Sequence, residues 1–207
     1  MEKTACLLFI DFEFTMPEDK DKPYGFFSEI IETGIVFVQD GHIHSQYSSY
    51  VQPNEFPVLT NRCKKFLGID ESMLEQGISF KELISLLEQY NQLGNPTVIT
   101  WGNMDMKVLR HTCEMAGLPF PLEGKQIDLS MQYKKFFGDQ NQTGLRKAVQ
   151  QYGNQGTGQH HRALDDALTT YEIYQLIEKD KTYLNNYKVT KIGDLFDIDE
   201  VWRKFTS

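Results

Sequence analysis

Two acidic side chains follow an apolar stretch near the start of the chain. Asp11 and Glu13 come directly after residues 5–10, whose composition is typical of a strand covered on both faces. Residues two apart on a strand point to the same side, about 7 Å apart at a rise of ~3.3 Å per residue. Two carboxylates held in this way repel each other unless a cation lies between them. The pair therefore indicates either a cation site or a solvated strand end.

Further candidates lie later in the chain. Asp105 follows a second apolar stretch and is close to the start of a predicted helix, where an aspartate can also act as a helix cap. His161 and Asp166 form an H-x4-D motif between a Gly-rich loop and another predicted helix. His160 and Asp165 have the same spacing, and an aspartate in a first helical turn can simply interact with the helix dipole. Helical periodicity leaves both registers open.

Four separated carboxylates and one histidine are chemically compatible with a single site: Asp11, Glu13, Asp105, Asp166 and His161. Carboxylate oxygens suit Mg²⁺ or Mn²⁺, which keep several waters and share the oxygens of a substrate phosphate. Two such ions about 3.5–4 Å apart can hold a phosphodiester, activate a water and stabilise the leaving oxygen. A histidine with a pKa of about 6.5 can take the proton from that water.

The elements that must position these residues form an α/β pattern. Five segments have the composition of strands: residues 5–10, 30–38, 42–51, 97–101 and 125–129. Four segments place apolar residues at helical spacing: residues 80–90, 105–115, 145–152 and 163–177. The Asp40-Gly41 turn favours a hairpin between the second and third strands. The order predicts a mixed five-stranded sheet that starts with three antiparallel strands and is flanked by helices.

Length and composition are those of one globular domain. A chain of 207 residues with 40% hydrophobic residues is too apolar for a disordered protein and long enough to bury a core. We expect one domain over residues 1–178, with residues 179–207 as an appendage that packs on it or trails from it. The net charge of −8 argues against a sequence-independent coat on nucleic acid, which needs a basic surface.

The expected compartment is the cytoplasm. No apolar run approaches the ~20 residues that a membrane span needs, and the first residues lack the order of a signal peptide. The 3 cysteines are far apart and form no C-x-x-C pair, which argues against a disulfide framework or a zinc site. We expect no membrane partner.

Taken together, the motifs resemble those of the DEDDh group of 3′–5′ exonucleases. The matches to the three motifs of that family are Asp11 with Glu13, Asp105, and His161 with Asp166. The third motif of the family has the form H-x-A-x-x-D, and Ala163 stands two residues after His161, so the resemblance selects His161 over His160. The likeness spans about residues 5–177 and implies a ribonuclease H-like exonuclease fold.

The resemblance implies a role for each matched residue. The four carboxylates would hold two Mg²⁺ or Mn²⁺ ions, and His161 would be the general base. Phe14 and Thr15 would meet the terminal nucleotide by backbone and side chain. Asp128 matches a position that is usually supporting rather than catalytic.

The implied activity is metal-dependent release of nucleoside 5′-monophosphates from the 3′ end of single-stranded nucleic acid. Residues 11–15, 28–32 and 50–69 are most similar to a branch that trims histone mRNA and small RNAs, so we expect RNA rather than DNA as the partner. Similar bacterial members include an inhibitor of a sporulation kinase pathway, which implies a component of such a pathway as a further partner. The alternatives are a regulatory binding protein with an incidental nuclease site, and an oligoribonuclease for very short RNAs.

Other residues have two interpretations each. Three basic pairs could follow a nucleic-acid backbone or form ordinary solvated faces: Lys64-Lys65, Lys134-Lys135 and Arg146-Lys147. Arg162, next to the site histidine, is a better candidate for a substrate phosphate. Tyr24, Phe26 and Phe27 could stack on bases or cover the edge of the sheet.

Overall fold

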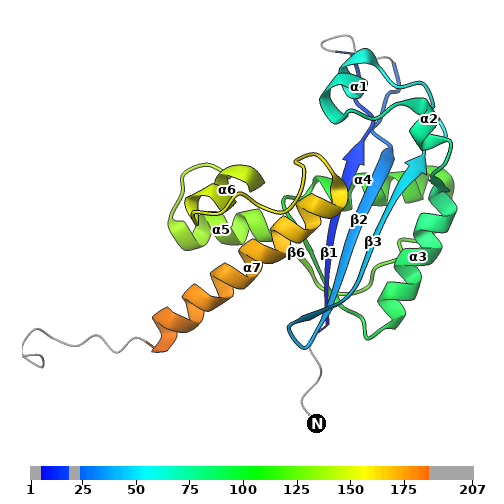
Figure 1. The fold of residues 1–207 in the computed structure, drawn as a ribbon. Coiled ribbons are helices and arrows are strands. Elements are labelled where there is room, and N and C mark those ends of the chain that lie inside the picture. Colours follow the sequence, from blue (N-terminus) through cyan, green and yellow to red (C-terminus); the bar gives the residue numbers. More distant parts are fainter. Residues whose placement is uncertain (1–5, 19–23, 187–207) are drawn as a thin grey trace, which may run out of the picture. The chain divides into compact units, whose positions relative to one another are not determined.

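A six-stranded mixed sheet lies at the centre of the computed structural model, which describes residues 6–18 and 24–186 (Figure 1). Its strands are β1 (Cys6–Phe14), β2 (Ile30–Gln39), β3 (His42–Gln52), β4 (Ile78–Ser79), β5 (Thr97–Thr100) and β6 (Gln126–Asp128). Their order across the sheet is β4-β3-β2-β1-β5-β6. β1, β2 and β3 pair antiparallel, whereas β5 is parallel to β1 and β6 is parallel to β5.

The predicted mixed sheet is confirmed, with two differences. The five predicted strands are joined by β4, which has 2 residues and pairs with the end of β3 at Val51 and Gln52. Two residues have no periodicity, so the sequence could not predict this strand. β1 also continues beyond residue 10 to Phe14, and it includes Asp11 and Glu13, which the strand period had placed at its carboxyl end.

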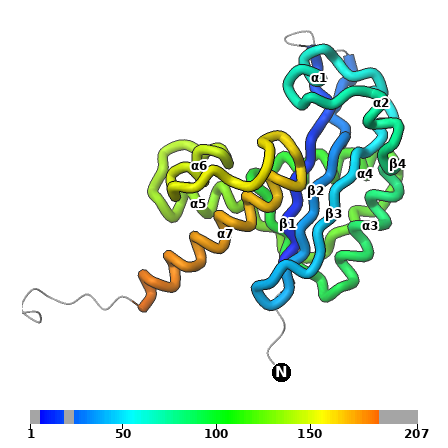
Figure 2. Tube along the Cα trace, in the orientation of Figure 1, coloured from blue at the N-terminus to red at the C-terminus, as the bar shows by residue number. Residues whose placement is uncertain are grey.

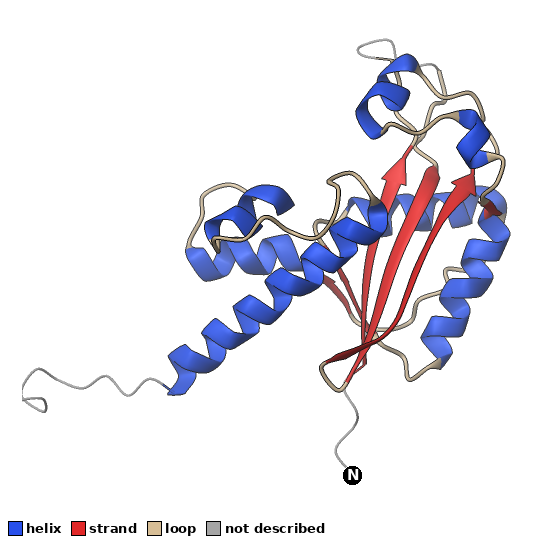
Figure 3. Cartoon of the chain, in the orientation of Figure 1, coloured by secondary structure: helices blue, strands red, loops and turns tan. Residues whose placement is uncertain are grey.

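Helices lie on both faces of the sheet (Figure 3). They are α1 (Asn61–Leu67), α2 (Glu71–Leu74), α3 (Phe80–Gln92), α4 (Met104–Ala116), α5 (Leu129–Phe137), α6 (Leu145–Gln151) and α7 (Ala163–Asn186). Helices α3 and α4 share a core with Leu8, Ile10 and Phe12 of β1. Because alternate residues of a strand face opposite sides, the residues between them face the other way.

That other face of β1 carries Asp11 and Glu13 and meets the start of α7. The contact is close because β2 has a glycine there: a Cβ on Gly34 would overlap the backbone of Ala163. The chain trace in Figure 2 shows α7 beginning beside β1 and β2. The first turn of α7 is thereby brought next to the two carboxylates of β1.

Three helices were not predicted, and all three are short. Their N-caps are Thr60, Asp70 and Asp128, each of which accepts a hydrogen bond from the backbone N–H three residues further on. Short helices gain most of their stability from tertiary packing rather than from local propensity. Helices α1 and α2 accordingly bury Leu67 and Leu74 in a separate apolar cluster. Each short helix buries only a few residues, which are too few to give a helical period that sequence analysis could detect.

The described chain divides into two units between Tyr174 and Gln175, inside α7. The boundary predicted after residue 178 falls in the same helix. Residues 187–207 of the predicted appendage lie outside the described residues, so this boundary stays a prediction. Within the described ranges, no helix has the length and apolar character that crossing a bilayer requires.

Candidate active site

Carboxylates from β1 and α7 converge at one point. Oxygen atoms of Asp11, Glu13 and Asp166 lie within 4.8 Å of one another. The strand period places Asp11 and Glu13 on the face toward α7, and Asp166 lies in the first turn of that helix. Three of the four predicted carboxylates are therefore brought together from opposite ends of the sequence.

The fourth carboxylate, Asp105, reaches the site from α4. Its Oδ1 accepts a hydrogen bond from the backbone N–H of Phe12 at 3.0 Å, which ties the start of α4 to β1. The N-cap of α4 is Asn103, so Asp105 does not cap the helix. Its charge is close enough to Asp11 to raise the pKa of that carboxyl.

The pKa values of these buried carboxyl groups are raised. Burial raises the pKa of Asp11 well above its usual range, and the charges of Asp105 and Asp166 raise it further. Burial, followed by the charges of Asp166 and Glu32, raises the pKa of Glu13 to about 8. Burial raises the pKa of Asp105 to about 7. No lysine or arginine among the described residues forms an ion pair with the three-carboxylate group, so this donor set fits divalent cations that prefer oxygen ligands.

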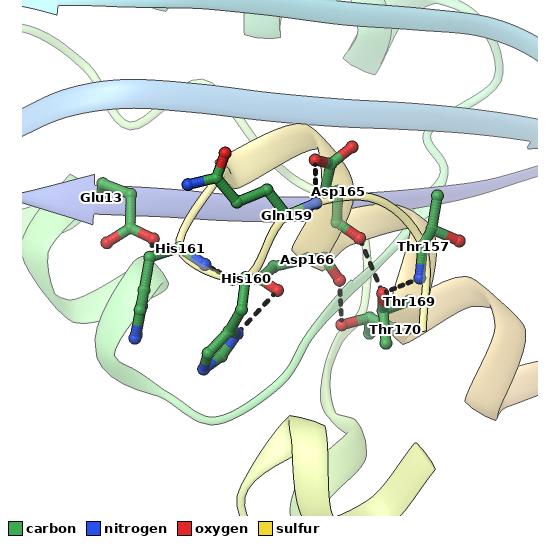
Figure 4. A network of polar contacts seen from close by, with 9 residues as sticks. All are labelled: Glu13, Thr157, Gln159, His160, His161, Asp165, Asp166, Thr169 and Thr170. Carbon is green, nitrogen blue, oxygen red and sulfur yellow. Dashed lines mark hydrogen bonds and ion pairs between the residues drawn. The ribbon is translucent and has the colours of Figure 1, made fainter. Parts of the chain in front are cut away.

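Both neighbouring histidines lie beside these carboxylates (Figure 4). Nδ1 of His161 is 3.7 Å from Oε1 of Glu13, and Nδ1 of His160 is 3.2 Å from Oδ1 of Asp166. The two rings lie 3.9 Å apart between centroids. Burial, followed by the charge of His160, lowers the pKa of His161. The exposed ring of Phe66, which sequence reasoning missed, lies 4.3 Å from the ring of His161.

The structure distinguishes Asp165 from Asp166, the two aspartates between which helical periodicity alone could not choose. Oδ2 of Asp165 accepts a hydrogen bond from the backbone N–H of Gln159 at 2.7 Å, and Figure 4 shows this carboxylate turned away from Glu13. Oδ2 of Asp166 accepts the backbone N–H of His161 at 3.0 Å. His161 has a φ of 62°, a left-handed backbone that is uncommon for residues other than glycine. Asp166, not Asp165, therefore joins the carboxylates of β1.

The three predicted substrate-binding residues have different surroundings. Phe14 ends β1, next to an irregularity in its pairing with β2. Thr15 is buried, and its Oγ1 accepts the backbone N–H of Glu29 at 2.9 Å. Nη1 of Arg162 lies 3.3 Å from Oε2 of the buried Glu32. The guanidinium of Arg162 is thus already paired with a carboxylate, a contact between residues 130 positions apart that no local pattern could predict.

Glu29 supports the end of β1, although sequence reasoning did not single it out. Its buried carboxylate accepts hydrogen bonds of 2.7–3.1 Å from the consecutive backbone N–H groups of Asn54, Glu55 and Phe56. Its backbone carbonyl accepts the N–H of Thr15 at 2.8 Å. Glu29 therefore joins the residue after β1 to the loop that follows β3. Its signals in the sequence were an acidic residue directly before an apolar strand and its place within residues 28–32, one of the segments that carry the resemblance.

Asp128 and the aromatic residues Tyr24, Phe26 and Phe27 lie outside the carboxylate group. Oδ1 of Asp128 accepts the backbone N–H of Gly102, so this residue fixes the turn after β5 and agrees with a supporting position. Phe26 and Phe27 contact the ring of Phe56 at 4.8 and 5.4 Å, which favours the covering role over base stacking for these two. Tyr24 is fully exposed.

Comparisons with known proteins identify relatives that match most of this chain. Residues 8–174 match the family model described as Exonuclease. The chain is 50% identical over 203 residues to a Bacillus subtilis protein named "Probable 3′-5′ exonuclease KapD", with 98% of this chain and 99% of that protein covered. Human "ERI1 exoribonuclease 2" is 30% identical over 189 residues, which cover 79% of this chain and 27% of that protein.

A solved structure gives the same result. The nuclease domain of 3′hExo, described as a DEDDh family member bound to rAMP, superimposes with a TM-score of 0.76 at 25% identity. The match covers 86% of this chain and 94% of that chain. The ribonuclease H-like exonuclease fold expected from the sequence is confirmed.

Proposed function

Because this chain belongs to the exonuclease family and is a DEDDh 3′–5′ exonuclease, we propose that it shortens single-stranded nucleic acid from the 3′ end and releases nucleoside 5′-monophosphates. The main support is the convergence of Asp11, Glu13 and Asp166 within 4.8 Å, with no ion pair to a lysine or arginine in the described chain. RNA is the preferred substrate in this proposal, because the human relative is named an exoribonuclease and the 3′hExo domain is bound to rAMP.

Two Mg²⁺ or Mn²⁺ ions are the proposed cofactors, and the four carboxylates would hold them: Asp11, Glu13, Asp105 and Asp166. When bound, such ions stabilise the charge on a phosphodiester and lower the pKa of an attacking water. Burial is the main cause of the raised pKa values of Glu13 and Asp105, so the charged forms of both carboxylates are poorly stabilised without a cation.

His161 is the proposed general base. Its pKa is lowered, so the ring is neutral at neutral pH and one ring nitrogen is free to accept a proton. Its ring lies beside Glu13, on the side of the site where β1 ends. Thr15 is proposed to meet the terminal nucleotide: its oxygen accepts the N–H of Glu29, which leaves the hydroxyl proton available as a donor.

Digestion of matched RNA and DNA oligonucleotides with Mg²⁺ or Mn²⁺, with products identified by mass, tests this function. We expect nucleoside 5′-monophosphates from the 3′ end, faster from RNA, and no reaction in excess EDTA. Asp11→Asn should abolish digestion while circular dichroism shows an unchanged fold, because the amide has nearly the same shape but no charge. Undiminished turnover by Asp11→Asn, or full activity in EDTA, would contradict the proposal.

The same materials separate the two alternatives. An oligoribonuclease would turn over a dinucleotide faster than a 20-mer, whereas we expect the longer strand to be the better substrate, since each added base can stack on the protein. A regulatory role independent of catalysis would survive Asp11→Asn in cells. We also propose a cytoplasmic location, supported by the described cysteines, which are all free thiols.

A further inference from the structure

Arg146 is a cation near the site that has no partner in the described part of the chain. Arg162, the cation predicted to bind phosphate, is paired with Glu32. Arg146 is the second residue of α6, and its exposed side chain makes no ion pair, hydrogen bond or ring contact with any described residue. The guanidinium of Arg146 is therefore free to bind an anion. It lies beside the carboxylates that are proposed to bind cations.

Arg146 lines a cavity of about 80 Å³ that reaches Asp166, one of the site carboxylates. His160 and Asp166 line the same cavity, so Asp166 belongs both to the carboxylate group and to the cavity wall. The charge of Arg146 also helps to lower the pKa of His161, which places the guanidinium within electrostatic range of the site.

Residues 155–158 of the loop before α7 also line the cavity, and α7 holds this loop in place. The backbone N–H of Thr157 donates to Oγ1 of Thr169 at 3.0 Å, and that of Gln159 donates to Asp165 at 2.7 Å. In Figure 4, Thr157 and Thr169 lie on the far side of the two histidines from Glu13. The cavity is therefore a continuation of the site away from the end of β1.

We propose that Arg146 binds the substrate phosphate immediately 5′ to the scissile phosphate. The terminal nucleotide of a 3′ end has a free 3′ hydroxyl and a single phosphate, which is the scissile one. A second phosphate within reach of the site can therefore lie only on the 5′ side. A guanidinium suits a phosphate because its planar N–H groups can donate two parallel hydrogen bonds. This inference rests on the proposed exonuclease function.

The test compares Arg146→Gln with Lys147→Gln on two substrates. Lys147 is the matched control, because it is an exposed cation on the same helix that does not line the cavity. One substrate is a single-stranded 10-mer. The other is the p-nitrophenyl ester of a nucleoside 5′-monophosphate, which has the scissile phosphate but no upstream nucleotide.

We expect Arg146→Gln to lower kcat/KM on the 10-mer by about tenfold or more, mainly through KM, as for loss of a hydrogen bond to a charged group. The slope of log kcat/KM against log salt should fall by about 0.7, the value for one contact to a single-strand phosphate. Turnover of the ester should not change. Lys147→Gln should stay within about twofold of the wild type on both substrates.

A neutral methylphosphonate at the upstream phosphate of the 10-mer gives an independent readout. This replacement should lower kcat/KM of the wild type by the same factor as the Arg146→Gln substitution does. It should not lower kcat/KM of the Arg146→Gln variant any further. Equal losses on the 10-mer and the ester, or no loss on the 10-mer, would overturn the assignment of Arg146 while the exonuclease function stands. If the wild type cleaves neither substrate, the proposed function itself fails, and the inference fails with it.

Discussion

Gly34 of β2 lies directly against the backbone of Ala163, the first residue of α7, with no room for a Cβ between them. Gly34 is also the register partner of Asp11 across the β1–β2 pairing. Residues paired in this way point to the same face of a sheet, so α7 can reach Asp11 only because Gly34 has no side chain. This contact determines how close Asp166 comes to the carboxylates of β1.

Gly34→Ala should therefore lower kcat by about 100-fold, because displacement of a site residue by ~1 Å can have that effect. Gly124→Ala is the matched control: a Cβ on Gly124 would overlap the carbonyl oxygen of Pro96, away from the site. Melting temperatures and kcat are measured for both variants. We expect both to lose stability, and only Gly34→Ala to lose catalysis and affinity for Mg²⁺. Equal kcat values in two folded variants would show that Gly34 does not position the site.

The metal-free protein should lose stability as the pH rises. Glu13 and Asp105 have ordinary pKa values of 4.5 and 3.8, and burial raises them in the folded protein to about 8 and about 7. Between these values the folded state binds more protons than the unfolded state, so the free energy of unfolding falls from about pH 4.5 to about pH 8. Thermal melts in EDTA across this range measure the effect. A difference in melting temperature between the wild type and Glu13→Gln that does not change with pH would contradict it.

Mg²⁺ should reverse this loss. Its stabilisation should be larger at pH 8 than at pH 5, because protons compete with the cation for the same oxygens at the lower pH. Glu13→Gln should show a flatter melting profile in EDTA and a smaller response to Mg²⁺. Glu123→Gln, which alters an exposed carboxyl outside the site, is the control and should behave as the wild type.

The two histidines should differ in their effect on catalysis. His161→Ala should lower kcat by 10²–10⁴-fold, roughly the range for loss of a general base. His160→Ala should cost less, because His160 contacts Asp166 at the cavity side of the site. Single-turnover rates at saturating substrate and Mg²⁺ make the comparison. A larger loss for His160→Ala would transfer the role of base to that residue.

Glu29 should prove important for both stability and substrate binding. Glu29→Ala leaves three consecutive backbone N–H groups without their acceptor, at a cost of about 2–3 kcal/mol in the free energy of unfolding. Because Glu29 also bonds to Thr15, KM should rise for short substrates. Glu55→Ala, an exposed residue of the same loop, is the control for urea melts and kinetics. A Glu29→Ala variant as stable as this control would show that the carboxylate does not hold the loop.

Much of the fold and of the site could be predicted from the sequence because it depends on short-range patterns. Alternation within one strand places Asp11 and Glu13 on the same face, and apolar spacing predicted helices α3, α4, α6 and α7. Asp166 of the H-x4-D motif and Asp105 of the mid-chain motif were predicted as site residues because each lies near the start of a predicted helix. Short helices such as α1 and α5 were missed, because local caps and a few packed residues stabilise them without a repeating pattern.

The amino-acid sequence alone determined which strand or helix carries each acidic residue, because the strand and helix periods can be recognised within a few neighbouring residues. Only the folded chain decided which charges meet: Arg162 pairs with Glu32, Arg146 has no partner among the described residues, and Asp166 rather than Asp165 turns toward Glu13. The reason is that such pairings depend on how distant elements approach each other. Here that approach depends on the missing side chain of Gly34.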